Sequence, residues 1–222
     1  MRFSFPSLLL LSMTPFAASP GTAQEIHLNA ALVSTDAEPV DGEIPPFCPF
    51  QPFAIGETGI LVSPGALDLS PYVGEIVHLA AVDQTGGCPT KIFLATAVSE
   101  PTATLEACGV PRPGCDMRFR VGPTASGQGL LAASFGEQGF LSLGDPLGVL
   151  FLGAPILLLG PTGPDGVLDL SVPPSAPIGV AIQLQGMHVE VGPGTGAAAL
   201  SNPLQLELVF GPACIDPTGC GF

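Results

Sequence analysis

The apolar residues of this chain fall into short runs in which every second position is hydrophobic. Over residues 25–33, for example, Ile26, Leu28, Ala30 and Leu32 share one side, and the other side carries polar or small residues. Side chains alternate between the two faces of a β-strand, so a period of two predicts a strand with one buried face. We therefore expect a half-buried strand at residues 25–33.

Similar runs continue along the rest of the chain. Residues 147–159 are apolar enough to suggest a membrane span, but Gly148, Gly153 and Pro155 interrupt them, so they predict two buried strands. The apolar positions change parity after Gly186, as a β-bulge would cause. No run has a long, capped helical period, so helix content should be low. The other expected strands lie at residues 59–62, 67–69, 75–82, 91–98, 117–121, 130–135, 140–143, 168–172, 178–184, 187–191 and 204–210.

The composition agrees with many short strands joined by tight turns. The chain has 29 Gly and 26 Pro, yet 46% of its residues are hydrophobic, which is enough apolar surface to offset the entropy of ordering the backbone. One-faced strands of this kind are buried by stacking antiparallel sheets. The polar segment 99–104 contains Pro101 and suits a domain boundary. We expect an all-β protein with two small antiparallel domains, a barrel or sandwich at 24–100 and a β-sandwich at 101–222.

The N-terminal residues have the pattern of a secretory signal peptide. Arg2 precedes an apolar stretch at residues 3–13, and small and turn-forming residues follow up to Ala23. We therefore expect residues 1–23 to be removed and the protein to be secreted, periplasmic or displayed at the cell surface. The apolar stretch is too short to span a bilayer, and we expect no membrane span after its removal.

The charge balance narrows the classes of partner. Five Lys and Arg residues stand against 19 Asp and Glu residues, a formal net charge of −14. Such a surface repels phosphate backbones and anionic lipid head groups, so we expect no nucleic-acid partner and no peripheral membrane role. Other cell-surface proteins and glycans are the partner classes that remain, and the sequence leaves the oligomeric state open.

Six cysteines in an exported chain predict three disulfides. The boundary near residue 100 favours Cys48 with Cys88. For the other four cysteines we expect local pairing, Cys108 with Cys115 and Cys214 with Cys220. Cross-pairing between the two ends of the second half is the alternative. A metal site is disfavoured because the spacing contains no C-x-x-C motif. The four remaining cysteines are Cys108, Cys115, Cys214 and Cys220.

Calcium is the cofactor that the acidic residues would bind, because hard cations prefer oxygen ligands. The first candidate ligands are Asp36, Glu38, Asp41 and Glu43, which lie close together in a proline-bearing segment. These residues do not match an EF-hand loop, so a solvated acidic loop is the simpler interpretation. Asp165 and Asp169 flank a second candidate turn. Without calcium, we expect no cofactor.

Catalytic signatures are absent from the sequence. His27, His78 and His188 lie in expected strands, and no G-x-S-x-G or H-E-x-x-H motif accompanies them. The loop at 192–196 lacks the lysine of a phosphate-binding loop. A pair of distant carboxylates could still meet, which keeps a hydrolase as an alternative. The chain has no Trp and one Tyr, Tyr72, which weakens a sugar-stacking site.

Two partial resemblances accompany these patterns. Residues 127–210, with the motifs at 144–148, 166–172 and 200–204, resemble the C-terminal β-sandwich of uncharacterised Gly/Pro-rich exported bacterial proteins. The first half, around residues 67–74 and Cys88-Pro89, is similar to small barrels of OB-like character. The resemblances imply a fold and import no catalytic residue or ligand.

These observations rank three functions. The first is a non-enzymatic secreted or cell-surface module with a structural, adhesive or protein-interaction role. The second is a calcium- or glycan-binding module, and the third is a secreted hydrolase that uses a carboxylate pair. The sequence therefore leans towards a protein that is not an enzyme and leaves the question open.

Overall fold

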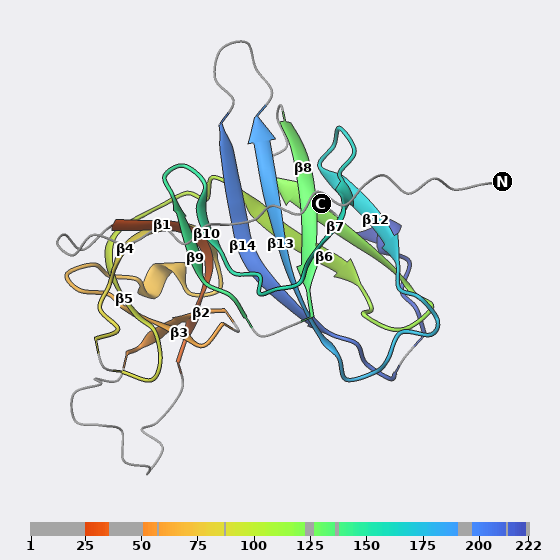
Figure 1. Ribbon diagram of the computed structural model, residues 1–222, viewed down its shortest axis with the longest axis horizontal. Helices are drawn as coiled ribbons and strands as arrows, with labels where there is room; N and C mark the ends of the chain where they lie inside the picture. The colour runs from red at the N-terminus through yellow and green to blue at the C-terminus, as the bar shows by residue number, and fades with distance from the viewer. Residues whose placement is uncertain are drawn as a thin grey trace.

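A computed structural model describes residues 25–35, 51–56, 58–86, 88–122, 127–135, 138–190, 197–211 and 213–220. In these residues the protein is all-β, as the alternating runs predict, and its helical content is two short 3-10 turns (Figure 1). The described residues contain no helix that is long and apolar enough to cross a membrane. The 3-10 turns are η1 (Ser70–Tyr72) and η2 (Pro217–Gly219).

The first half of the chain forms a small closed barrel. Its strand order is β1-β2-β3-β5-β4, and β3 pairs with β5 in parallel whereas the other neighbours are antiparallel. The first half is therefore a closed barrel, one of the two architectures expected for it from the sequence. The alternation in β1 points Leu28 and Leu32 into the fully buried core. The strands are β1 (Glu25–Ser34), β2 (Phe53–Ile55), β3 (Ile60–Ser63), β4 (Ile76–Asp83) and β5 (Ile92–Ser99).

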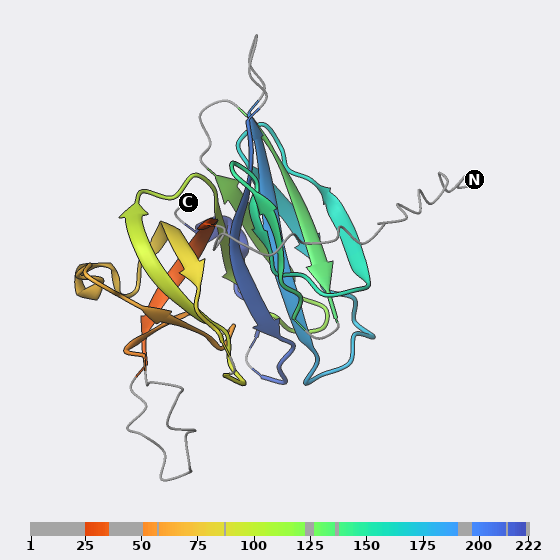
Figure 2. The ribbon, with the colours of Figure 1, turned by 60° about the vertical axis from the view of Figure 1, so that its left-hand side comes forward.

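The second half forms a sandwich of two antiparallel sheets, which Figure 2 shows beside the barrel. One sheet has the order β11-β8-β13-β14, and the smaller sheet has the order β12-β7-β6. Leu105, Phe119, Leu131 and Leu184 form the core between them. The strands are β6 (Thr104–Gly109), β7 (Asp116–Gly122), β8 (Gly127–Ser134), β11 (Ile156–Pro161), β12 (Val167–Ser171), β13 (Ala181–Glu190) and β14 (Ala198–Glu207).

A hairpin from the second half packs on the barrel. Strands β9 (Leu141–Gly144) and β10 (Gly148–Leu150) form a separate two-stranded sheet. Val149 and Phe151 belong to the core of the barrel, and the ring of Phe140 lies 5.4 Å from that of Phe93. The chain passes from barrel to sandwich between Ser99 and Thr104, yet this hairpin returns to the barrel. The two halves therefore share part of one core.

The two sheets of the sandwich come very close together around Val121. A Cβ atom built on Gly129 would lie 2.7 Å from the Cβ of Val121, and one built on Gly186 would lie 2.8 Å from its Cγ2. Only glycine fits this approach at either position. The pairing of β13 with β14 shifts register between Gln185 and Met187, which confirms the bulge predicted at Gly186.

Three buried side-chain amides join the elements where backbone pairing stops. Asn29 of β1 donates to the carbonyl of Leu200 in β14 at 2.8 Å. The side chain of Asn202 pairs with both backbone groups of Leu105 in β6, at 2.8 Å and 3.2 Å. Gln185 is 2% exposed and bonds backbone groups of β10, β14 and the residue after β10. Each amide thus links two different sheets or subassemblies.

Several strand predictions were wrong in detail. Residues 67–69 precede η1 and form no strand, because Leu69 is held in a turn by the backbone bond from Tyr72 to its carbonyl. The predicted strand at 204–210 instead spans Ala198–Glu207, and the one at 178–184 begins at Ala181. Strands β2 and β6 carried too few alternating residues to be predicted.

The two buried strands predicted at 147–159 are also corrected. Val149 and Phe151 are buried, but Ile156 to Leu159 form the edge strand β11 and are exposed, Leu158 by 68%. Strand β11 is an edge of its sheet and pairs with β8 alone, and none of these four apolar side chains is buried.

The disulfides follow the cross-pairing alternative, and the local pairing was wrong. Cys108 bonds Cys220, and Cys115 bonds Cys214, with Cα atoms 6.3 Å and 5.3 Å apart. In the pairing of β6 with β7, Cys108 lies opposite Arg118, so Cys115 is not its neighbour. Cys88 is disulfide-bonded as well, and Cys48, its predicted partner, lies outside the described residues.

The bonds of Gln185 yield a test of the fold. Replacing Gln185 with Leu leaves the N–H of Phe151 and the carbonyls of Val149 and Ser201 buried without these partners. Each unsatisfied group costs about 1–3 kcal/mol, so we expect the free energy of unfolding to fall by about 3 kcal/mol or more. Urea denaturation measures this loss.

Gln183 is the matched control, because it lies two residues earlier on the same face of β13. Its Oε1 is buried and has no partner. Gln183→Leu therefore removes an unsatisfied acceptor, and we expect stability within about 1 kcal/mol of the wild type, or a gain. Equal losses in the two variants would show that the Gln185 bonds do not hold the hairpin to the sandwich.

Candidate functional site

The acidic candidates from the sequence do not assemble a cation site in the described residues. Asp36, Glu38, Asp41 and Glu43 all lie outside that part of the chain. Asp169 forms a bidentate ion pair with Arg118, with N–O distances of 2.7 Å and 2.9 Å. The carboxylate of Asp165 accepts a hydrogen bond from the N–H of Val167. The Arg118 bond holds the pKa of Asp169 below its usual value. Within the described ranges, no group of three or more His, Cys, Asp and Glu residues is placed to hold a metal ion.

Two of the three histidines meet on the outer surface of the barrel. His27 on β1 and His78 on β4 lie with Nδ1 and Nε2 3.4 Å apart, and Glu25 lies 3.6 Å from the far side of His27. Nδ1 of His78 and Nε2 of His188 on β13 are both buried and have no hydrogen-bond partner. A single proton can bridge the facing nitrogens, whereas two protonated rings would repel each other.

The environment of His78 disfavours protonation of its ring. Burial lowers its pKa below 6.5 and the nearby His27 lowers it further, while Asp145 in the β9–β10 turn opposes both. The pair has no nucleophile or carboxylate dyad beside it in the described residues, so it is better suited to a pH-sensitive contact than to hydrolysis.

The lowered pKa of His78 predicts how stability depends on pH. The unfolded chain binds a proton near pH 6.5, whereas the folded chain resists it, so stability is full above that pH and declines as the pH falls below it. We expect His78→Gln to flatten the dependence of the melting temperature between pH 7.5 and 5. His27→Gln should flatten it partly, because it removes one cause of the shift. An unchanged slope in His78→Gln would contradict this assignment.

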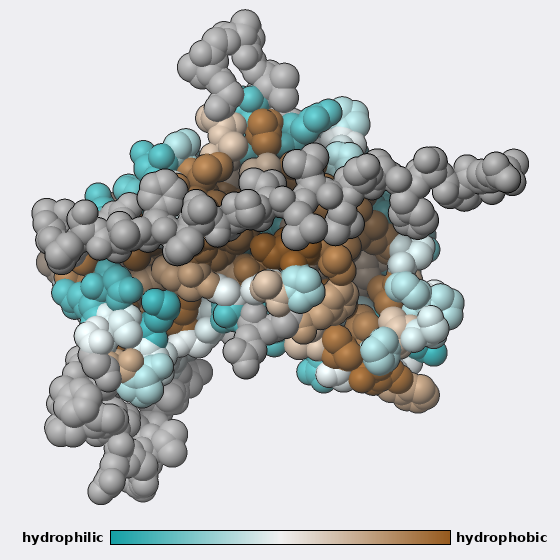
Figure 3. Space-filling view, viewed as in Figure 1, coloured by the Kyte–Doolittle hydropathy of each residue, from teal (hydrophilic) through white to brown (hydrophobic). Residues whose placement is uncertain are grey.

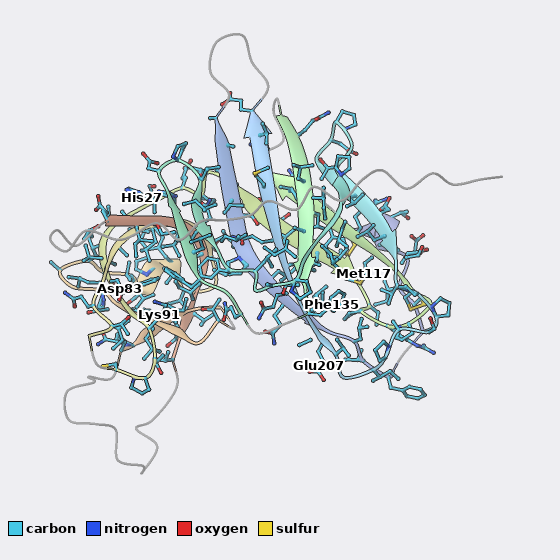
Figure 4. The ribbon with its side chains drawn as sticks, viewed as in Figure 1. His27, Asp83, Lys91, Met117, Phe135 and Glu207 are labelled. Atoms are coloured by element: carbon cyan, nitrogen blue, oxygen red, sulfur yellow. A yellow bond between two sulfur atoms is a disulfide. The ribbon has the colours of Figure 1, made fainter. Side chains whose placement is uncertain are left out.

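An apolar cavity lies between the two sheets of the sandwich. Its volume is about 470 Å³, and its wall is built from seventeen residues of both sheets and of the 173–180 loop. Figure 4 labels two of them, Met117 of the smaller sheet and Phe135 at the end of β8. The lining residues are Pro111, Met117, Phe119, Ala133, Phe135, Leu159, Leu170, Ser171, Val172, Pro173, Ala176, Pro177, Val180, Ile182, Leu184, Leu206 and Leu208.

The cavity follows from the way the sheets approach each other. At Val121 they are in contact through glycines, but Phe119 and Met117, further along β7, leave the intervening space unfilled. Three strands also cannot cover four, so inward-facing side chains such as Leu170, Ile182 and Leu206 stay only partly buried. The prolines of the 173–177 segment line this end without contributing a strand that could close it.

The chemistry of the cavity is almost wholly apolar. Its lining contains no titratable side chain, and Ser171 is its one polar residue. The hydroxyl of Ser171 donates a short hydrogen bond to the carboxylate of Asp116 on the outer face of the sheet. The cavity therefore offers neither a nucleophile nor a carboxylate pair, and it provides no free hydrogen-bond partner from a side chain.

Exposed apolar residues continue from the cavity onto the surface. Phe135 and Leu159 belong to the lining and are 51% and 36% exposed. Ile178 in the adjacent loop is 50% exposed. Figure 3 shows hydrophobic residues, in brown, at the surface of the sandwich half. Patches of this kind on a soluble protein mark sites of ligand or partner binding.

Sequence reasoning missed this cavity because all its residues resemble ordinary core residues. One signal was available: the segment 173–177 contains three prolines between two strongly alternating strands, where a covering strand would be needed. The four apolar residues from Ile156 to Leu159 were a second signal. Without alternation, the sequence does not indicate which face of the strand is buried.

The chain matches no protein-family model, and no curated protein matches it. Its function must therefore be argued from the cavity itself.

Proposed function

We propose that this protein is an exported, non-enzymatic binding module that takes up an apolar molecule between the sheets of its sandwich. The observation that carries the proposal is the apolar cavity of about 470 Å³. Cavities of roughly 300–1,000 Å³ lined by hydrophobic side chains are typical of small-molecule sites. The sequence predicts an interaction module without naming its site or its ligand. The proposal places the site in the sandwich cavity and makes the ligand apolar.

The energetics favour an apolar guest. Leu170, Ile182 and Leu206 face the cavity and remain partly exposed to water. Each methylene group that a guest buries contributes about 0.8 kcal/mol, before the cost of immobilising the guest. A sugar would instead lose hydrogen bonds to water and find none in the wall, so the glycan alternative draws no support from this cavity.

The proposed location outside the cytosol rests on the N-terminal residues of the sequence and agrees with the disulfides. Cys108–Cys220 and Cys115–Cys214 tie the C-terminal segment to the end of the smaller sheet. Such bonds persist in oxidising compartments. Two lining residues lie near these bonds in the sequence: Pro111 stands between Cys108 and Cys115, and Leu208 precedes Cys214.

Binding of a neutral dye tests the proposal. Nile red, whose fluorescence rises in apolar surroundings, should bind the oxidised protein with saturable affinity. Ala176→Phe places an aromatic ring at a half-buried position of the cavity wall. We expect it to weaken dye binding about tenfold or more, since the ring occupies the volume that the dye needs. Fluorescence titration measures both affinities.

Ala66→Phe is the matched control. Ala66 is exposed in a turn of the barrel and does not line the cavity. Its dye affinity should stay within about twofold of the wild type, and melting curves should show that both variants are folded. Absence of saturable binding, or equal weakening in the two variants, would overturn the proposed function.

A further inference from the structure

We infer that the ligand is a single-chain amphiphile with a neutral or cationic head group, whose tail enters the cavity and whose head stays at the opening of the cavity. The inference rests on the proposed function and specifies its ligand. It follows from the size of the cavity, the absence of polar partners inside it and the charge of the protein around it.

The size of the cavity fits one hydrocarbon chain. An engineered cavity of about 150 Å³ in another protein holds one benzene molecule, so a space about three times larger holds on the order of 18 carbon atoms. The volume here is about 470 Å³. A flexible chain can follow a wall that is built from two sheets and a loop, from Met117 of the smaller sheet to Leu159 of the edge strand β11.

Strands at the edges of both sheets contribute to the wall of the cavity. Strand β11 pairs with β8 alone and β12 pairs with β7 alone, so the two strands are edges of their sheets. Leu159 of β11 and Leu170 of β12 both line the cavity. Phe135, Pro173 and Pro177 also line the cavity and are exposed, so an elongated guest can enter beside the 173–177 segment, which contributes no strand.

The head group must remain at this opening. A polar group buried without a partner costs roughly 2–7 kcal/mol. Ser171 is the one polar lining residue, and its hydroxyl is already bonded to Asp116. The head group therefore stays at the opening, where it keeps its contacts with water.

The surrounding charge selects against anions. The formal net charge is −14. Lys91, Arg118 and Arg120 each lie within 4.0 Å of a carboxylate, so their charge is largely offset. A negative field repels an anionic head group and attracts a cationic one, and salt weakens both effects.

Three amphiphiles with the same chain test the inference. Dodecylammonium and dodecanoate, each below its micellar concentration, and dodecanol, below its solubility, are titrated at pH 7.5 against protein loaded with Nile red. At low ionic strength we expect dodecylammonium to displace the dye at a concentration at least about fivefold lower than dodecanoate. The ratio should shrink towards unity in 0.5 M salt.

Asp116 precedes the lining residue Met117 and accepts the hydroxyl of the lining residue Ser171, so Asp116→Lys reverses a charge close to the cavity. In this variant, the concentration of dodecanoate that displaces the dye should exceed that of dodecylammonium by about twofold or less. Glu75→Lys changes an exposed position of the barrel and should leave this preference largely unchanged. Dodecanol has no charge, so equal displacement from both variants verifies that the cavity is intact. If Asp116→Lys loses dodecanol binding, Asp116→Asn replaces it, with Glu75→Gln as its control and a smaller narrowing expected.

The outcomes separate this inference from the proposed function. Equal displacement by all three amphiphiles, or tighter binding of dodecanoate, would overturn the selection against anions and leave an apolar site. Failure of every chain to displace a dye that Ala176→Phe excludes would overturn a chain-shaped ligand. Failure of the dye to bind saturably would overturn the proposed function itself.

Discussion

The contact of the two sheets at Val121 is the constraint on which the sandwich depends. Gly129 and Gly186 bring strands of the larger sheet so close to this side chain that no Cβ fits at either position. The bulge at Gly186 lies beside Gln185, whose amide bonds the hairpin and β14, so the point of closest approach is also anchored to its neighbours. Away from this point the sheets are free to separate, and the cavity occupies the space that results.

The buried amides and the disulfides hold the two ends of this arrangement. Asn202 fixes β6 of the smaller sheet to β14, and the amides of Asn29 and Gln185 fix the barrel and its hairpin to the sandwich. The Cys115–Cys214 bond restrains the opposite end, near the cavity. Since a buried amide without a partner is costly, these bonds favour one relative position of the elements. A cavity in a rigid frame can persist, whereas one in a loose frame would collapse.

The sequence supported the fold class well and the site poorly. Alternation in β1, β4 and β5 predicted strands because one face of each lies against the core of the barrel. The prediction was wrong at Ile156 to Leu159, since hydrophobicity does not reveal whether another layer covers a strand. The cavity was not predicted for the same reason: Leu170 or Ile182 looks alike whether its neighbour is a side chain or empty space. The disulfides required the register that sets Cys108 opposite Arg118.

An open sandwich with an apolar edge needs protection from pairing with itself. In β11, the register shift between Leu158 and Gly160 and the terminal Pro161 interrupt the regular edge that another strand would need. The high net negative charge adds a repulsion between copies that acts before contact. The acidic composition thus has a structural purpose beyond solubility: it allows apolar residues to stay exposed around a cavity without making the protein aggregate. The same field acts on any ligand that approaches the opening, so protection from self-association and selection by charge have one physical origin.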